Sequence, residues 1–141
     1  MRCYWKKGGS KRTYTYIKNE NIKNYVKEYK LFFSKAFSTN ATIPPEIIIG
    51  DINDICTETF LKIGSFQSRQ EAENCLSYMN TKFFRMLFKS GRSSMNISQK
   101  VFELIPIQDF SKSWTDSELY EKYNLNIEEI NYIESNIEEI K

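Results

Sequence analysis

Residues 68–91 read SRQEAENCLSYMNTKFFRMLFKSG and predict the longest helix of the chain. Ser68 has the side-chain oxygen of a helix N-cap, and Glu71 follows three residues later, so the pair matches a capping box. Gly91 is the expected stop, so the helix should run to about Lys89. Apolar residues recur at helical spacing, as expected for one face packed on a core. This stripe consists of Ala72, Leu76, Met79, Phe83 and Leu87, widened by Phe84 and Phe88.

Strand-like patterns lie on both sides of this helix. Alternating or uniformly apolar runs predict strands, and they fall at 13–17, 31–33, 47–49, 57–63 and 101–107. A short amphipathic helix is expected over 21–29, and 38–45 reads as a loop because it holds two prolines. A capping box at Thr115 and a cap at Asn126 open two further helices. We therefore predict an α+β fold, a small curved mixed β-sheet packed with helices.

Length and composition limit the classes of function. A chain of 141 residues fits one domain, 1–141. The sequence holds no His and three widely spaced Cys, which argues against a disulfide framework, a zinc site and His-based catalysis. It also has no Gly-rich nucleotide loop. We expect no catalytic residues, no metal and no cofactor.

Acidic residues give a weak case for a metal-dependent nuclease. Asp51, Asp54 and Glu58 form one cluster, and Asp109, Asp116 and Glu118 form another. Nucleases of the common restriction type need an acidic residue followed by E-x-K, and Glu58-Thr-Phe-Leu-Lys62 has the wrong spacing. Structural use of these carboxylates is the better interpretation.

The chain gives no sign of a membrane segment or a leader. Its apolar runs are shorter than the roughly 18 residues that cross a bilayer. The first residues, MRCYWKKGGSKR, are basic but lack the apolar stretch of a signal peptide. We expect a cytoplasmic protein with no membrane contact.

Charge is distributed very unevenly along the sequence. The formal net charge is only +2, yet residues 1–35 carry +8 and residues 101–141 carry −7. Residues 36–67 carry −3 and residues 68–100 carry +4. A polyanion-facing surface and a separate acidic end, with helices over 115–141, are the natural expectation. The alternative for the N-terminal excess is an ordinary Lys-rich solvated surface.

Three stretches resemble a known family. They are CTETFLKIG (56–64), SRQEAENCLSYMNTKFFR (68–85) and VFELIPIQDFSKSWTDSELY (101–120). Together they resemble the C-terminal specificity part, or target-recognition domain, of adenine-specific DNA methyltransferases and restriction enzymes of restriction-modification systems. SMNISQKVFELIPI (94–107) is similar to the closing segment of target-recognition domains in type I specificity subunits. The resemblance implies a module that reads double-stranded DNA. The N-P-P-Y motif of such methyltransferases is absent, so a methyltransferase or endonuclease domain or subunit would supply catalysis.

Two groups of cations are the candidate DNA contacts. The first lies in a basic flexible arm, 1–12, where glycines allow close approach to phosphate. The second shares one face of the long predicted helix and its end, or else is the solvated face of a core helix. The candidates are Lys6, Lys7, Lys11 and Arg12 in the arm, then Lys82, Arg85, Lys89 and Arg92, with Ser93 and Ser94 following.

Side chains that could read bases are fewer. The amides of Asn96 and Gln99 could pair with adenine, although many surface amides do nothing of the kind. Trp5, Tyr14 and Tyr16 could stack at a groove, or simply pack.

A second function remains open, that of a protein-interaction module. Isoleucines recur at helical spacing in the last predicted helix and could dock on a partner helix. They are Ile127, Ile130, Ile133, Ile137 and Ile140.

Overall fold

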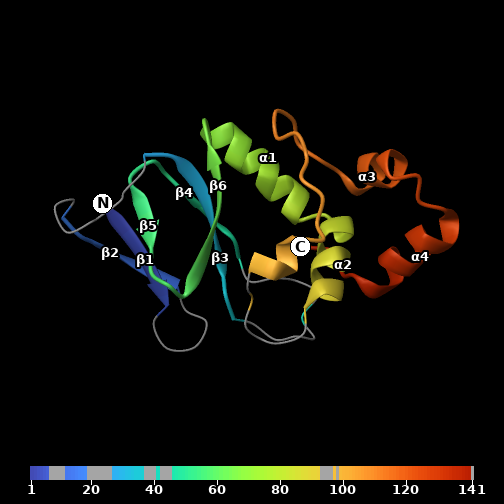
Figure 1. Cartoon of the computed structure of the whole chain (residues 1–141), viewed down its shortest axis with the longest axis horizontal. Coiled ribbons are helices and arrows are strands. Elements are labelled where there is room, and N and C mark those ends of the chain that lie inside the picture. Colours follow the sequence, from blue (N-terminus) through green and yellow to red (C-terminus); the bar gives the residue numbers. More distant parts are fainter. Residues whose placement is uncertain are drawn as a thin grey trace.

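A computed structural model of the chain describes residues 1–6, 12–18, 27–36, 41, 46–92, 97 and 99–140. Strands come first and helices follow (Figure 1). The strands are β1 (Arg2–Lys6), β2 (Arg12–Tyr16), β3 (Tyr29–Ser34), β4 (Ile48–Gly50), β5 (Asp54–Cys56) and β6 (Phe60–Phe66). The helices are α1 (Arg69–Met79), α2 (Lys82–Gly91), the short 3-10 helix η2 (Gln99–Phe102), α3 (Asp116–Lys122) and α4 (Ile127–Asn136).

These strands form two three-stranded sheets, ordered β2-β1-β5 and β4-β3-β6. In the first, the N-terminal sheet, β1 pairs antiparallel with β2 and parallel with β5. In the second, the central sheet, β3 pairs antiparallel with both neighbours. The predicted α+β class is confirmed, whereas the prediction of one small sheet is wrong. Short apolar runs show that strands exist but not which of them pair.

The central sheet lies between the helices and the N-terminal sheet (Figure 1). Because side chains alternate along a strand, Leu31 and Phe33 of β3 join the core under α1 and α2. Phe32 points the other way, where its ring centroid lies 5.5 Å from Tyr4 and 6.4 Å from Phe60. Burial on both faces explains why this strand is continuously apolar.

A buried ionic cluster joins the two sheets beside these rings. Asp54, whose side chain is 2% exposed, accepts two hydrogen bonds of 2.8 Å from the Arg2 guanidinium and one of 2.8 Å from the backbone N–H of Asp51. Lys30 of β3 is also buried and donates to the carbonyl oxygens of Asp51 and Asp54, both at 2.9 Å. Hydrogen bonding to Asp54 raises the pKa of Arg2, and burial lowers the pKa of Lys30. The cluster therefore ties β1, β3 and the start of β5 together.

Two helices replace the single helix predicted for 68–91. Ser68 is the N-cap of α1, as predicted, and its side chain accepts the Glu71 N–H at 3.2 Å. The helix ends at Asn80, and Thr81 caps α2 by accepting the Phe84 N–H at 3.1 Å. The break falls here because side chains take over the backbone groups of the new helix end. Gly91 is the last residue of α2, so the predicted stop is confirmed.

Residues 101–107, predicted as a strand, are instead the end of η2 and an irregular segment along α1. Tyr78 donates its hydroxyl to the Pro106 carbonyl at 2.7 Å, and Asn74 donates to the Phe110 carbonyl at 2.8 Å. The prediction is wrong because side chains of α1 replace a neighbouring strand as hydrogen-bond partners.

The other predicted elements agree in part. Strands predicted at 13–17, 31–33 and 47–49 are confirmed as β2, β3 and β4, with shifted ends. The strand predicted at 57–63 begins only at Phe60, so Thr57 and Thr59 do not alternate with Leu61. Residues 2–6 of the predicted flexible arm form β1. Most of the predicted helix 21–29 and loop 38–45 lies outside the described residues.

The last two helices follow the prediction closely. Thr115 and Glu118 form a reciprocal capping box on α3, and Asn126 and Glu129 form one on α4. Across the described ranges, no helix is long and apolar enough to cross a membrane.

We predict that Asp54→Asn lowers the free energy of unfolding by about 2–4 kcal/mol, because Arg2 and Lys30 lose their buried counter-charge. Asp51→Asn is the control. The Asp51 side chain is 43% exposed, so this substitution should lower the free energy of unfolding by less than about 1 kcal/mol. Urea denaturation measures both. Equal losses would show that the buried carboxylate does not hold the sheets.

We also predict that Phe83→Ala lowers the free energy of unfolding by about 3–5 kcal/mol. Phe83 is buried and stacks on the Tyr123 ring with centroids 5.1 Å apart. Ile127→Ala is the control, since Ile127 is largely exposed. It should change the free energy of unfolding by no more than about 0.5 kcal/mol. A loss under about 1 kcal/mol for Phe83→Ala would contradict its place in the core.

Candidate nucleic-acid interface

The β1–β2 hairpin brings two of the predicted cations to one end of the N-terminal sheet. Lys6 closes β1, and its register partner Arg12 opens β2. Directly opposite positions share one face of an antiparallel pair, where like charges repel. An anion is the natural counterpart for two such positions. Lys7 and Lys11 lie between them in the sequence and outside the described residues.

An aromatic row, partly packed on the central sheet and partly exposed, lies on one face of this hairpin. Alternation places Tyr4, Tyr14 and Tyr16 on the face that Lys6 and Arg12 share. The Tyr14 ring centroid lies 5.7 Å from those of Tyr4 and Tyr16, and the Tyr14 and Tyr16 residues are 47% and 70% exposed. Flat rings exposed beside cations suit stacking on bases or sugars.

A chain of backbone hydrogen bonds connects β1 to the far side of the central sheet. The Thr57 N–H donates to the Tyr4 carbonyl at 3.0 Å, and the Lys35 N–H donates to the Thr59 carbonyl at 3.1 Å. The Ile97 N–H then donates to the Lys35 carbonyl at 2.7 Å. The turn at 57–59, part of the stretch CTETF, therefore connects the two sheets.

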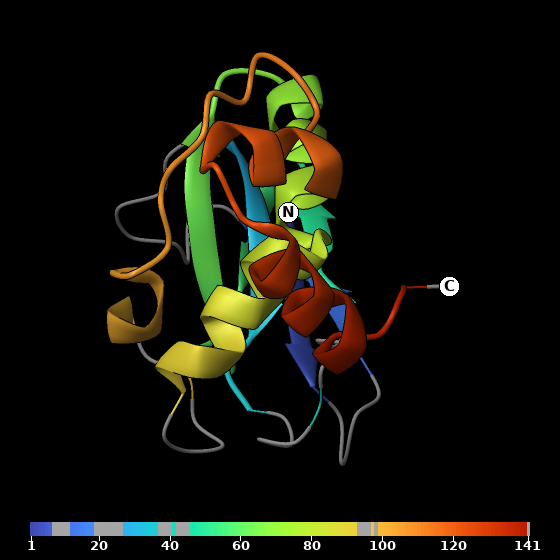
Figure 2. The ribbon, with the colours of Figure 1, turned by 90° about the vertical axis from the view of Figure 1, so that its right-hand side faces the viewer.

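Four parts of the fold that carry Lys or Arg in their sequence lie toward one side of the molecule. In Figures 1 and 2 the ends of β1, β3 and α2 all point toward the lower side. η2 adjoins the end of α2, because a Cβ on Gly91 would lie 3.3 Å from the Val101 carbonyl oxygen. We call this set the basic edge. It comprises Lys6, Arg12, Lys35, Lys89, Arg92 and Lys100.

Two predicted contacts on α2 lie inside the protein instead. Lys82 is 8% exposed; it donates to Glu134 of α4 and lies 3.3 Å from Glu139. Arg85 is 3% exposed and donates to the carbonyls of Asn80 and Thr81, both at 3.3 Å. Burial lowers the pKa of Arg85. The predicted common face of Lys82, Arg85 and Lys89 is therefore not a solvated stripe, and of the three residues Lys89 alone is exposed.

The remaining candidates are dispersed or undescribed. Arg92 is half-buried, with its guanidinium carbon 5.7 Å from the centroid of the Phe88 ring. Gln99 is exposed on η2. Ser93, Ser94 and Asn96 lie outside the described residues, as do the side chains of Trp5, Lys6 and Arg12. Lys35 and Lys100 were not predicted as contacts. No sequence pattern around them indicates such a role, because only tertiary contacts bring them to the basic edge.

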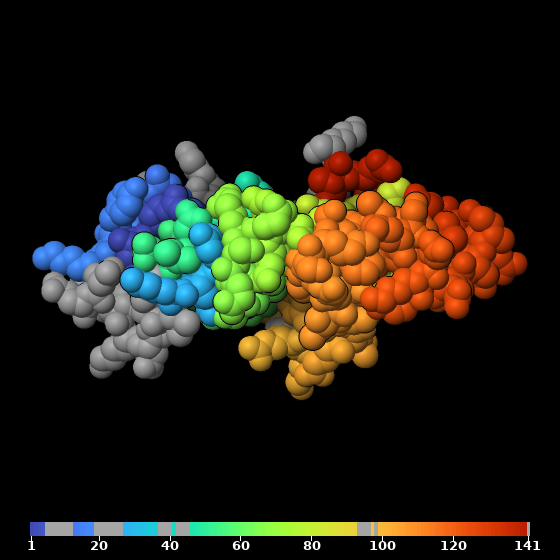
Figure 3. Space-filling model, turned by 90° about the horizontal axis from the view of Figure 1, so that it is seen from above, coloured from blue at the N-terminus to red at the C-terminus, as the bar shows by residue number. Residues whose placement is uncertain are grey.

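The acidic helices lie at the opposite end of the molecule. Figure 3 shows the N-terminal sheet at one end and the C-terminal segment at the other. The isoleucine stripe of α4 is divided, since Ile133 and Ile137 are buried in the core while Ile127 and Ile140 are exposed. The stripe mainly fixes α4 to this protein, which weakens the case for a partner helix docked along it.

The described residues offer little for catalysis. Within the described ranges, no group of three or more His, Cys, Asp or Glu could hold a metal ion. Burial raises the pKa of the Cys56 thiol to about 11 and that of Cys75 to about 12. Both remain thiols near neutral pH, and the thiolate is the nucleophilic form.

Comparisons with protein-family models, curated proteins and solved structures found no match to this chain. The resemblance to target-recognition domains therefore stays a prediction from the sequence.

We predict that Lys82→Gln lowers the free energy of unfolding by about 1–2 kcal/mol, because the ion pair between α2 and α4 is removed. Lys89→Gln is the control, because it removes the same charge from an exposed position of the same helix. It should change the free energy of unfolding by no more than about 0.5 kcal/mol. Chemical denaturation compares the two. If the two variants had the same denaturation midpoint, the ion pair of Lys82 would not contribute to stability.

Proposed function

We propose that this chain binds duplex DNA through the basic edge. The observation that carries the proposal is that four parts of the fold with Lys or Arg in their sequence lie toward one side: the β1–β2 hairpin end, the end of β3, the end of α2 and η2. The most acidic segment lies at the end of the molecule away from the N-terminal sheet. Such a dipolar distribution orients a protein toward a polyanion.

The basic edge would supply affinity rather than selectivity. Lys and Arg that neutralise phosphates release counterions, and this attraction is the same for every base sequence. Because the cations come from four elements, they could follow a stretch of phosphodiester backbone. Lys6 and Arg12, at opposite positions of the hairpin, would contribute to this contact.

Selectivity would come from the polar and aromatic side chains near the edge. The exposed amide of Gln99 has the donor and acceptor pattern that pairs with adenine in the major groove. Tyr14 presents an exposed ring near the hairpin end, and the exposed ring of Tyr16 lies farther along the same face. Rings at a groove contact sugars and bases, which phosphate-binding cations do not read.

The biological role that we propose is that of a specificity domain in a restriction-modification system. The three stretches at 56–64, 68–85 and 101–120 support this role by their resemblance to such domains. A separate methyltransferase or endonuclease domain or subunit would perform the reaction. The acidic helices α3 and α4 would face that partner or solvent.

We predict that replacing Lys6 and Arg12 together with Gln weakens binding equally for a preferred and a scrambled duplex. The slope of log affinity against log salt should flatten by about 0.9 for each phosphate that the variant no longer neutralises. Gln99→Ala should instead change the preference between the duplexes and leave the slope nearly intact. Fluorescence anisotropy at several salt concentrations measures both quantities.

The matched control replaces Arg69 and Lys112 with Gln, which removes the same charge from exposed positions outside the basic edge. This variant should keep the wild-type slope. An unchanged slope in the Lys6/Arg12 variant, or an equal change in the control, would remove the hairpin end from the interface.

A further inference from the structure

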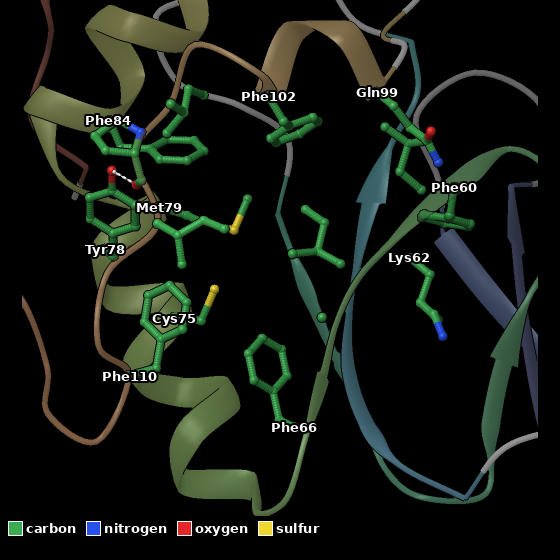
Figure 4. Close-up of a pocket in the computed structure, with 16 residues that line it drawn as sticks. Phe60, Lys62, Phe66, Cys75, Tyr78, Met79, Phe84, Gln99, Phe102 and Phe110 are labelled. Carbon is green, nitrogen blue, oxygen red and sulfur yellow. Dashed lines mark hydrogen bonds between the residues drawn. The ribbon is translucent and has the colours of Figure 1, made fainter.

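A pocket of about 660 Å³ opens between β6, α1, η2 and the segment 105–110 (Figure 4). Its walls are mainly aromatic and aliphatic, with Phe66, Cys75 and Met79 on one side and Phe84, Phe102 and Phe110 around them. Most of the lining lies away from the basic edge. Of its lining, the proposed DNA interface uses Gln99 alone.

The wall formed by β6 depends on a β-bulge. The register between β3 and β6 changes from Tyr29 opposite Phe66 to Leu31 opposite Ile63, which leaves one extra residue on β6. Gly64 lies in this bulge with a φ of +76°, a conformation that favours glycine. A Cβ there would lie 2.2 Å from the Phe66 ring. The bulge thus allows that ring to fold over the strand and close one side of the pocket, a use of bulges common beside binding sites.

The chemistry of the walls favours an uncharged occupant. The Tyr78 hydroxyl already donates to the Pro106 carbonyl at 2.7 Å. Lys62 pairs with Glu28, and Figure 4 shows its ammonium turned away from the aromatic wall. Burial raises the pKa of Cys75 to about 12, so this thiol stays neutral. A buried charge without a partner would be costly among such side chains.

The mouth of the pocket adds one polar group and an exposed apolar rim. Gln99 lines the pocket where η2 meets β6, and its amide provides a donor and an acceptor. Ile107, also in the lining, is 88% exposed, an unusual position for a large apolar side chain. The volume falls in the range of small-molecule sites, roughly 300–1,000 Å³.

We propose that this pocket binds a neutral, largely apolar small molecule with one polar group directed at Gln99. The aromatic walls bury the apolar part, and the amide orients the polar group. The proposal does not depend on DNA binding, because of the residues argued here only Gln99 is shared with the proposed DNA interface and the apolar walls lie apart from it.

The test uses two dyes with the same ring system, neutral N-phenyl-1-naphthylamine and anionic 8-anilino-1-naphthalenesulfonate. Fluorescence titration of the whole chain should show saturable binding of the neutral dye, one molecule per chain. The sulfonate should bind about tenfold more weakly or worse, because the walls offer it no counter-charge. Absence of saturation, or equal affinity for the two dyes, would overturn the proposal.

Three variants locate the binding. Cys75→Leu adds bulk inside the pocket and should lower the affinity for the neutral dye by about tenfold or more. Ile107→Asp places a charge at the mouth and should also weaken it. Leu104→Asp makes the same change at an exposed residue that does not line the pocket, and should leave the affinity within about twofold.

The exposed pair decides the question even if Cys75→Leu does not fold, which its circular dichroism spectrum would reveal. Equal weakening by Ile107→Asp and Leu104→Asp would overturn the proposal. Self-association that expels the dye as the protein concentration rises would do so as well, because it would assign the pocket to a second copy of the chain.

Discussion

The buried carboxylate of Asp54 determines where the N-terminal sheet can lie. An ionised carboxylate is tolerated away from water only with charge partners and hydrogen bonds, and here the Arg2 guanidinium and the Asp51 N–H supply them. Lys30 satisfies the carbonyls around it from the neighbouring sheet. Gly50 permits this closeness, because a Cβ there would lie 2.8 Å from the Phe32 ring. The position of the hairpin, and with it the basic edge, follows from these contacts.

Features that depend on neighbours in sequence could be predicted well. The caps at Ser68, Thr115 and Asn126 are all present, since a capping side chain meets a backbone N–H within three residues. The break before α2 was missed because part of its cause is distant. The Asp116 carboxylate accepts the N–H groups of Lys82 and Phe83, at 3.1 and 2.9 Å, and favours a helix start there. A continuous apolar stripe cannot reveal such a partner.

The candidate interface shows the same division between local and distant causes. Lys6 and Arg12 could be grouped from the sequence, because a short connection brings them opposite each other. Helical spacing also grouped Lys82 and Arg85 with Lys89, but spacing does not tell which cations a later segment will cover. Glu134 and Glu139 at the end of the chain pair with Lys82. The pocket could not be predicted either, because its walls come from β6, α1, η2 and an irregular segment.

The parallel pairing of β1 with β5 has a consequence for the order of folding. Arg2 and Asp54 are 52 residues apart, whereas the hairpin and the capped helices form from contacts between near neighbours. Closing a long loop loses chain entropy before the stabilising contacts form, so pairings between distant residues form slowly. Docking of the hairpin onto β5 is therefore expected among the last steps of folding. The N-terminal sheet would therefore be completed only after the hairpin and the capped helices have formed.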